Sequence, residues 1–402
     1  MQSPEHLEEA TRLIHGVADA LPAPRTPAPA IHRGSTILMP NTRALYDSAG
    51  PTYGRGGMET QRALTGALAQ LEHAEQAFLF PSGLTAITGT LLALTQAGDE
   101  VLVSDSVYAP TRAFIDGTLR RFGVRAHYFA PSEDAASIAA RISPATRLIF
   151  LESPGSLTLE MQDVPAIARM ARERGVLTVI DNSWSAGVLF KPLDHGVDVS
   201  LQALTKYVCG HSDVFMGMAA ARGPAVERLA TADREIGWAV SPDDAYMALR
   251  GLRTLRPRMA AHGAAALELA HWLEEQPEVR TVLSPALPDF PGHALWQRDF
   301  SGVCGLFAVV LQPGPAEAVE AMLDHLELFG IGYSWGGYES LVIPCDSQLA
   351  SRRFETDRGG PVVRLHVGLE DVADLRADLR RGLDRYALAC AEEPRMRVAA
   401  GA

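Results

Sequence analysis

The chain has 402 residues, of which 47% are hydrophobic and 21% are charged, a composition typical of a globular protein with enough chain for two or three domains. Its formal net charge of −12 argues against nucleic acid and an anionic membrane surface as partners, because both require a basic surface. No apolar run reaches the roughly 20 residues of a membrane span, and the acidic N-terminus "MQSPEHLEEATRLIHG" lacks the pattern of a secretory signal.

The four cysteines are Cys209, Cys304, Cys345 and Cys390, and no two of them have CxxC spacing. Scattered cysteines of this kind fit reduced thiols rather than a disulfide framework. Together with the polar N-terminus they predict a cytoplasmic protein.

Residues 1–60 are predicted to form an irregular N-terminal arm. The arm contains the proline-rich stretch "LPAPRTPAPA" (21–30), which we expect to be extended rather than packed. Further along, "YGRGG" (53–57) is rich in glycine. It lacks the lysine of a P-loop and the spacing of a dinucleotide-binding loop, so by itself it predicts a turn.

Between residues 61 and 245 the pattern alternates between helix-like and strand-like runs. The stretch 81–98 is predicted to be a helix, because its large apolar residues fall on one face and Gly98 ends it, and a second helix is predicted over 163–175. Short apolar runs predict buried strands over 100–105, 147–153, 176–181, 197–204 and 215–221. Helices interleaved with apolar strands indicate a mostly parallel sheet covered on both faces.

Residues 246–402 are predicted to form a smaller α+β domain. A long helix expected over 245–276 leads into it. The remaining elements are expected as strand 305–311, helix 315–329, strand 362–368 and helix 371–389. The predicted fold class is therefore α/β, with a large domain over 61–245, a smaller α+β domain over 246–402 and an N-terminal arm over 1–60.

Lysine is rare in this chain. Lys191 and Lys206 are the only lysines among 36 lysine and arginine residues, so the other 34 are arginine. Arginine cannot lose its proton in a protein, whereas a buried lysine can become a neutral, nucleophilic amine. Lys206, in "ALTKYVCGHSDV", follows a predicted strand and has apolar and hydroxyl neighbours, which predicts partial burial and a lowered pKa. Lys191, in "LFKPLDH", is predicted to be an ordinary loop lysine.

Other chemically useful side chains lie near the ends of the predicted strands. Asp181 ends one strand, Tyr108 follows another, and Ser82 and Gly83 begin the first predicted helix. Ligands gather at the carboxyl ends of parallel strands, and the free N–H groups of a helix start bind anions. Each of these residues alone is more often a cap or turn residue. Together with the Lys206 amine they supply what a pyridoxal phosphate site needs: an amine, a carboxylate, an aromatic ring and a phosphate cradle.

Two other classes of enzyme are disfavoured. No GxGxxG motif follows a predicted strand, which argues against a nicotinamide-dependent oxidoreductase. The 12 histidines show no ligand-like pairing, which argues against a metalloenzyme. His211, close to Lys206, is expected to be a structural or pocket-rim residue, and Asp213 a loop residue.

Several segments with matching spacing resemble the Cys/Met-metabolism family of pyridoxal phosphate enzymes. The longest is "VIDNSWSAGVLFKPLDHGVDVSLQALTKYVCGHSDVFMG" (179–217). The others are "YGRGGMETQRALTGALAQLE", "FLFPSGLTA", "FLESPGS", "YSWGGYESL" and "VVRLHVGLED". The resemblance covers roughly residues 35–390 and implies the type I fold of pyridoxal phosphate enzymes.

The resemblance implies a role for each matching residue. Lys206 would form the Schiff base with pyridoxal 5'-phosphate and carry protons, and Asp181 would pair with the pyridine nitrogen. The other implied cofactor residues are Tyr108 stacked on the ring, with Ser82, Gly83, Leu84 and Thr205 at the phosphate. Arg364 would bind the substrate carboxylate, and Tyr333, Ser334 and Trp335 would line the substrate pocket. Tyr53 and Arg55 would reach the phosphate of the neighbouring subunit, so the resemblance implies a homodimer with shared sites, usually paired into a homotetramer.

Within the family the chain is most similar to the β-lyase branch, which releases homocysteine, pyruvate and ammonia from L-cystathionine. Two features favour this branch: "ESPGS" stands where γ-acting relatives carry an asparagine, and Trp335 where they carry a smaller residue. The alternatives are a related carbon–sulfur lyase, such as a cysteine desulfhydrase or a γ-acting member, and a cofactor-binding regulator without turnover. The partners expected are an amino-acid thioether substrate and further copies of the chain, with neither nucleic acid nor membrane.

Overall fold

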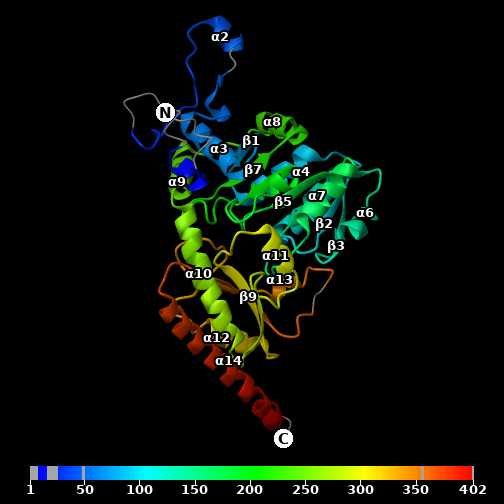
Figure 1. The fold of residues 1–402 in the computed structure, drawn as a ribbon, viewed down its shortest axis with the longest axis vertical. Coiled ribbons are helices and arrows are strands. Elements are labelled where there is room, and N and C mark those ends of the chain that lie inside the picture. Colours follow the sequence, from blue (N-terminus) through cyan, green and yellow to red (C-terminus); the bar gives the residue numbers. More distant parts are fainter. Residues whose placement is uncertain (1–7, 16–25, 48–49, 355–356, 401–402) are drawn as a thin grey trace.

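The computed structural model describes residues 8–15, 26–47, 50–354 and 357–400. Figure 1 shows a large sheet with its helices, a smaller sheet below it, and α10 running alongside the smaller sheet. Among the described residues no helix is both long enough and apolar enough to cross a membrane.

The N-terminal arm is less irregular than predicted. It contains α1 (Glu9–His15), α2 (Thr42–Asp47) and the short 3-10 helix η3 (Gly54–Gly56). Helix α1 is anchored because Leu13 is buried in the main core and Glu9 pairs with Lys191 and Arg256. Helix α2 lies away from the rest of the chain (Figure 1). Of the proline-rich stretch 21–30, residues 21–25 lie outside the described residues.

The large sheet of the described residues has the strand order β1-β7-β6-β5-β4-β2-β3; β7 pairs antiparallel with β1 and β6, and the other pairs are parallel. Its strands are β1 (Gln76–Phe80), β2 (Glu100–Ser104), β3 (Arg125–Phe129), β4 (Thr146–Glu152), β5 (Leu177–Asp181), β6 (Val199–Gln202) and β7 (Gly217–Ala221). The predicted, mostly parallel sheet is therefore confirmed. Strands β1 and β3 were not predicted, and β3 carries exposed polar residues that interrupt the apolar pattern.

Helices cover both faces of this sheet, as the wholly apolar strands predict. One apolar cluster packs under α4 (Gly83–Leu94), α5 (Ala109–Phe114), the π turn η4 (Ile115–Leu119) and α8 (Pro224–Ile236). The other packs under α3 (Glu59–Glu72), α6 (Ala135–Ala139), α7 (Val164–Glu173) and the 3-10 helix η5 (Pro192–His195), and continues into the smaller domain. The sheet is thus a rigid platform with its strand ends free to hold a site.

The single helix predicted over 245–276 is wrong. The chain forms two helices, α9 (Pro242–Leu252) and α10 (Leu255–Glu274). Pro257 explains the break, because proline has no N–H and its ring clashes with the carbonyl four residues earlier. It fits only in the first turn of a helix, so α10 has to start just before it.

The smaller sheet has the order β10-β11-β12-β9-β8 and is antiparallel except between β10 and β11. Its strands are β8 (Val279–Leu283), β9 (Leu306–Leu311), β10 (Gly330–Ile331), β11 (Leu341–Pro344) and β12 (Val362–His366). The accompanying helices are α11 (His293–Asp299), α12 (Ala316–Leu323), α13 (Asp346–Leu349) and α14 (Val372–Ala400). Helix α12 ends six residues before the predicted 329, because the N–H groups of residues 327–329 turn to the buried Asp378 carboxylate.

Candidate active site

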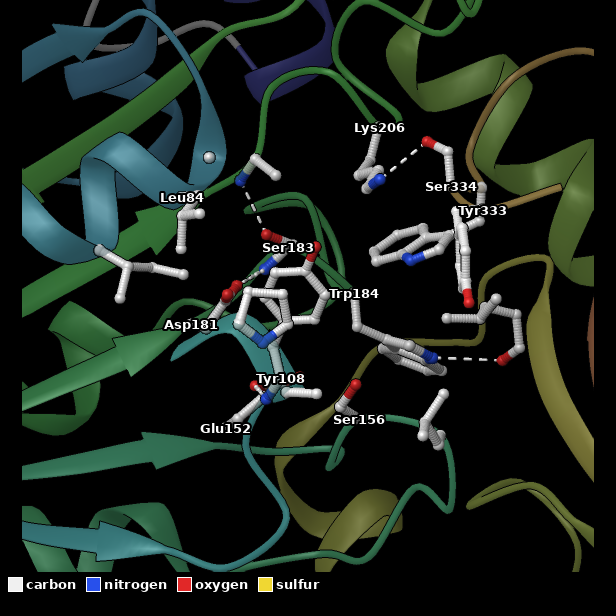
Figure 2. Close-up of a pocket in the computed structure, with 18 of the residues that line it drawn as sticks. Leu84, Tyr108, Glu152, Ser156, Asp181, Ser183, Trp184, Lys206, Tyr333 and Ser334 are labelled. Atoms are coloured by element: carbon white, nitrogen blue, oxygen red, sulfur yellow. Dashed lines mark hydrogen bonds between the residues drawn. The ribbon is translucent and has the colours of Figure 1, made fainter. Parts of the chain in front are cut away.

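A cavity of about 660 Å³ lies at the carboxyl ends of the central parallel strands. Residues at the ends of β4, β5 and β6 line one side of the cavity, and residues of the smaller domain line another (Figure 2). The sequence-predicted residues that line it are Ser82, Gly83, Leu84, Tyr108, Asp181, Thr205, Lys206, Tyr333, Ser334, Trp335 and Arg364. These residues, spread over more than 280 positions of the sequence, are therefore brought together at one place.

The Lys206 amine points into this cavity. The residue sits in a turn after β6, where its N–H donates to the Ala203 carbonyl at 3.0 Å. Its Nζ donates to Ser334 Oγ at 2.7 Å and lies 5.5 Å from the centre of the Trp335 ring. Burial and, after it, the Arg364 charge lower the pKa of Lys206, the Asp181 charge partly offsets both, and the net effect is a fall from 10.5 to about 8. The predicted partial burial and lowered pKa are confirmed.

Two carboxyl groups end neighbouring strands beneath the amine. Asp181 on β5 pairs in register with Glu152 on β4. Asp181 accepts the Ser183 N–H at 3.0 Å, and Glu152 accepts the Tyr108 N–H at 2.7 Å. Burial raises the pKa of both groups, and the Asp181 charge raises that of Glu152 further, to well above its usual range. Of the pair, Glu152 is therefore the group that holds a proton more readily, and Asp181 the group that more readily carries the charge.

The start of α4 forms an anion cradle. Ser82 caps the helix by accepting the Thr85 N–H at 3.1 Å. The N–H groups of Gly83 and Leu84, in the first turn, have no partner within the helix. A Cβ on Gly83 would lie 2.5 Å from the Ala203 Cβ, so only glycine lets the helix start approach the Lys206 turn this closely. The Thr205 hydroxyl accepts the Met216 N–H at 2.9 Å and donates to its carbonyl at 3.1 Å, which fixes that turn from the other side.

The smaller domain contributes Arg364 and the loop before β11. The Arg364 guanidinium donates to the Ser334 carbonyl at 3.0 Å, and burial lowers its pKa from the usual value. Tyr108, on the opposite side, is partly exposed, and burial together with Asp181 raises its pKa. Tyr333 is largely exposed at the rim, whereas Trp335 packs against the Tyr207 ring at 5.4 Å between centroids.

Tyr53 and Arg55 do not line the cavity of their own chain. The Arg55 guanidinium instead lies 5.3 Å from the Tyr53 ring centre, beside Gly237 at the end of α8. Neither residue has contact with Lys206 within one chain.

Lys191 is not the ordinary loop lysine that we predicted. Its side chain is only 17% exposed, and its amine pairs with the Glu9 carboxylate at 2.6 Å. The same amine donates to the carbonyls of Gly187 and Leu71. The mistake follows from local reasoning, because "LFKPLDH" contains none of the residues that receive these bonds.

Several polar and aromatic residues that line the cavity were not predicted: Glu152, Ser156, Ser183, Trp184, Phe215 and Gln348. Ser183 Oγ accepts the Ala203 N–H at 2.7 Å, and the Trp184 indole donates to the Leu306 carbonyl at 3.2 Å. Glu152 could have been found by the rule that found Asp181, because it too is a carboxylate at the carboxyl end of an apolar strand. No sequence signal marks Ser183 or Trp184.

These residues fit pyridoxal phosphate. The amine of Lys206 and the carboxylate of Asp181 face one cavity, and the glycine-dependent start of α4 lies beside them as a phosphate cradle. An α/β platform with this arrangement at its strand ends defines a pyridoxal phosphate-dependent enzyme of type I fold.

Comparison with known proteins identifies the family. Residues 10–384 match the family described as "Cys/Met metabolism PLP-dependent enzyme", and the chain belongs to this family. A cystathionine β-lyase of Bordetella avium is 44% identical over 88% of this chain and 91% of its own. An L-alanine/L-glutamate racemase of Wolbachia pipientis is 39% identical over 89% of this chain and 92% of its own. The crystal structure of a cystathionine γ-synthase from Xanthomonas oryzae, in complex with cystathionine, superposes with a TM-score of 0.88 at 30% identity, covering 95% of this chain and 99% of that one.

Proposed function

We propose that the chain is a cystathionine β-lyase, which cleaves L-cystathionine to homocysteine, pyruvate and ammonia in methionine biosynthesis. The observation that carries the proposal is the buried Lys206 amine, which donates to Ser334 Oγ at 2.7 Å and lines one cavity with Asp181 and Arg364. Relatives with this activity at 41–44% identity over 83% or more of the chain support the same reaction.

The large domain would hold pyridoxal phosphate. Lys206 would bind its aldehyde carbon, Asp181 would hold its ring nitrogen protonated, and Tyr108 would cover one ring face. The phosphate would lie on the N–H groups of Gly83 and Leu84, with Ser82 and Thr205 shaping the cradle. The bound cofactor supplies an electron sink for the charge that develops when Cα loses its proton.

Lys206 carries the proton steps. The lowered pKa of about 8 makes the neutral amine easier to form near neutral pH than in an ordinary lysine, as a positioned general base at Cα requires. The ammonium formed then donates that proton to the departing sulfur at Cβ. Ser334 Oγ accepts from Nζ at 2.7 Å and would hold the amine where it can reach both Cα and the sulfur on Cβ.

Arg364 orients the substrate. Its planar guanidinium suits a bidentate contact with the α-carboxylate, and burial in the cavity wall strengthens that contact. Tyr333, Ser334 and Trp335 would form the rest of the substrate wall. Trp335 beside the amine leaves less room than the smaller residue of γ-acting relatives, which favours elimination at Cβ.

The direct test is incubation of the purified protein and pyridoxal phosphate with L-cystathionine, followed by identification of the 2-oxo acid and the thiol. Pyruvate with homocysteine is expected. 2-Oxobutanoate with cysteine would instead indicate a γ-lyase. Release of pyruvate from cysteine but not from cystathionine would indicate a cysteine desulfhydrase. The Lys206→Ala variant should lose all turnover, and a variant that retained near-normal rates would contradict the role of this amine.

Racemisation of an amino acid is the second candidate function. It is favoured by the similarity to the Wolbachia relative, an L-alanine/L-glutamate racemase. Both reactions begin with removal of the Cα proton, so the groups around Lys206 are compatible with either. Formation of D-alanine from L-alanine, without any 2-oxo acid from cystathionine, would replace the first proposal by this one. A bound cofactor with neither activity would favour a regulator without turnover.

The assembly proposed is a homodimer with shared sites that pairs into a homotetramer in the cytoplasm. The arm over 1–60 would bring Tyr53 and Arg55 to the phosphate of the neighbouring subunit, residues 61–245 would bind the cofactor, and residues 246–402 would close the site. The position of Tyr53 and Arg55 outside their own cavity supports this exchange. Loss of cofactor affinity in an Arg55→Ala variant, together with recovery of activity in mixtures of Arg55→Ala and Lys206→Ala subunits, would test it.

A further inference from the structure

We propose that His366 is a positioning residue, which holds the loop over 333–337 so that Ser334 reaches both the Lys206 amine and the Arg364 guanidinium. The inference goes one step beyond the proposed function and rests on its roles for Lys206 and Arg364. His366 does not line the cavity itself.

Ser334 is the contact through which His366 would act. Its hydroxyl accepts from Lys206 Nζ at 2.7 Å, and its carbonyl accepts from Arg364 at 3.0 Å. Its φ of +97° lies in a region that residues with a side chain rarely adopt. A conformation of this kind persists only where surrounding contacts enforce it. The contacts of Gly336 and Gly337, which follow in the same loop, therefore help to hold Ser334 in this conformation.

His366 supplies such a contact two residues further along the loop. Its Nε2 accepts the Gly336 N–H at 3.0 Å, and the same nitrogen lies 3.1 Å from the Gly337 carbonyl oxygen. Gly336 itself has a φ of +84°, and a Cβ on it would lie 2.8 Å from the backbone of Lys206 and Tyr207. The loop is thus pressed against the Lys206 turn on one side and tied to His366 on the other.

His366 and Arg364 lie on the same strand, β12. Residues two apart on a strand point to the same face, so Arg364 and His366 both face the loop over 333–337. The ring is 1% exposed and packs against Tyr207 at 6.0 Å and His262 at 5.3 Å between centroids. Burial, and after it the His262 charge, lower the pKa of His366 to about 3, so the ring is neutral, and in the tautomer with its hydrogen on Nδ1 the Nε2 atom accepts the Gly336 N–H.

A pair of substitutions separates this role from simple packing. His366→Phe keeps a ring but removes the acceptor, whereas His366→Gln can place a side-chain oxygen near the position of Nε2. We expect kcat/KM of the Phe variant to fall about tenfold and that of the Gln variant to stay within about threefold of the parent. In the Ser334→Ala background the Phe substitution should have a smaller effect, because the contact with the Lys206 amine is already lost and only the contact of the residue 334 carbonyl with Arg364 remains to be disturbed.

A second measurement does not depend on the substrate. In the cofactor-free full-length chain, an amine-directed reagent followed by peptide mass spectrometry reports on Lys206, with Lys191 as the internal reference, because these are the only lysines. Release of Ser334 should raise the labelling rate of Lys206 severalfold in His366→Phe and leave it unchanged in His366→Gln. His262→Phe is the matched control, since His262 contacts the carbonyls of Val367 and Gly368 rather than the loop.

Three results would overturn the proposal: equal kinetic losses in the Phe and Gln variants, an undiminished Phe effect in the Ser334→Ala background, or unchanged Lys206 labelling in His366→Phe. If the Phe variant does not fold, His366→Leu also removes the acceptor and is scored in the same way. Failure of the cystathionine assay would leave the labelling result intact, so an error in the proposed function is distinguishable from an error here.

Discussion

Replacing Lys206 by methionine is expected to stabilise the cofactor-free chain at neutral pH while abolishing turnover. Methionine has nearly the length of lysine and carries no charge, so it fills the same space without desolvating an ammonium. Active-site groups are often held at a cost in stability, and their removal then raises the free energy of unfolding. The structure gives both the size and the pH dependence of this effect.

The size follows from the pKa of Lys206, which falls from 10.5 to about 8 on folding. One pKa unit corresponds to about 1.36 kcal/mol, so the buried ammonium costs at most about 3 kcal/mol. The lost hydrogen bond from Nζ to Ser334 Oγ offsets about 1 kcal/mol of the gain. The Lys206→Met variant should therefore be more stable than the parent by about 2 kcal/mol at pH 7.

The pH dependence has a definite sign. Below pH 8 the folded and unfolded chains both keep the Lys206 proton, and the full cost is present. Between pH 8 and 10.5 the unfolded chain binds more protons, so the stability of the parent rises with pH. The advantage of Lys206→Met should accordingly shrink across this interval, because every other titrating group is common to both chains.

The assay is urea unfolding of both cofactor-free chains, followed by tryptophan fluorescence at pH 7, 9 and 10 and at one fixed protein concentration. Lys191→Met is the matched control. Lys191 pairs with Glu9 at 2.6 Å and donates to the Gly187 carbonyl, so its loss should lower stability at every one of these pH values. A Lys206→Met chain no more stable than the parent at pH 7, or an advantage independent of pH, would refute the electrostatic account.

Three further predictions concern the rest of the site. Arg364→Lys should raise KM for the substrate roughly ten- to a hundredfold, because one ammonium cannot replace a bidentate contact, and steady-state kinetics with an unchanged KM would remove the carboxylate role. Gly83→Ala should weaken cofactor binding in an absorbance titration, since its Cβ would lie 2.5 Å from that of Ala203, whereas Gly66→Ala, with open space around it, should not. Glu152→Gln should keep kcat within roughly threefold while Asp181→Asn loses roughly a hundredfold or more, because only Asp181 has to carry a charge; equal losses would contradict the assignment of the proton to Glu152.

Much of the fold follows from local pattern. The five predicted strands of the large sheet were found because each is a short, largely apolar run, and of the helices that cover the sheet α4 and α7 were predicted. The errors occurred where a distant residue decides the local structure. Helix α12 ends early because Asp378, about fifty positions away, receives three backbone N–H groups. The break between α9 and α10, in contrast, was readable from Pro257 and was overlooked.

The site divides in the same way. Lys206, Asp181 and the start of α4 could be predicted, because each lies at or just after the end of a strand or at the start of a helix. Ser334 and Trp335 came only from family resemblance, and the actual bond from Lys206 to Ser334 spans 128 positions. His366 carries no local signal at all, since its partner Gly336 lies on a loop that only the smaller sheet brings beside β12.

The two lysines now have separate physical reasons to differ from the 34 arginines. At position 206 the proposed general base has to lose its proton, which a guanidinium cannot do. At position 191 the amine stays bonded to a carboxylate and two carbonyl oxygens, of Glu9, Gly187 and Leu71, which surround one nitrogen from three elements. A compact ammonium with three donors suits that arrangement, whereas a planar guanidinium directs its donors into one plane. A chain that uses arginine almost everywhere thus retains lysine where the chemistry or the geometry requires a single nitrogen.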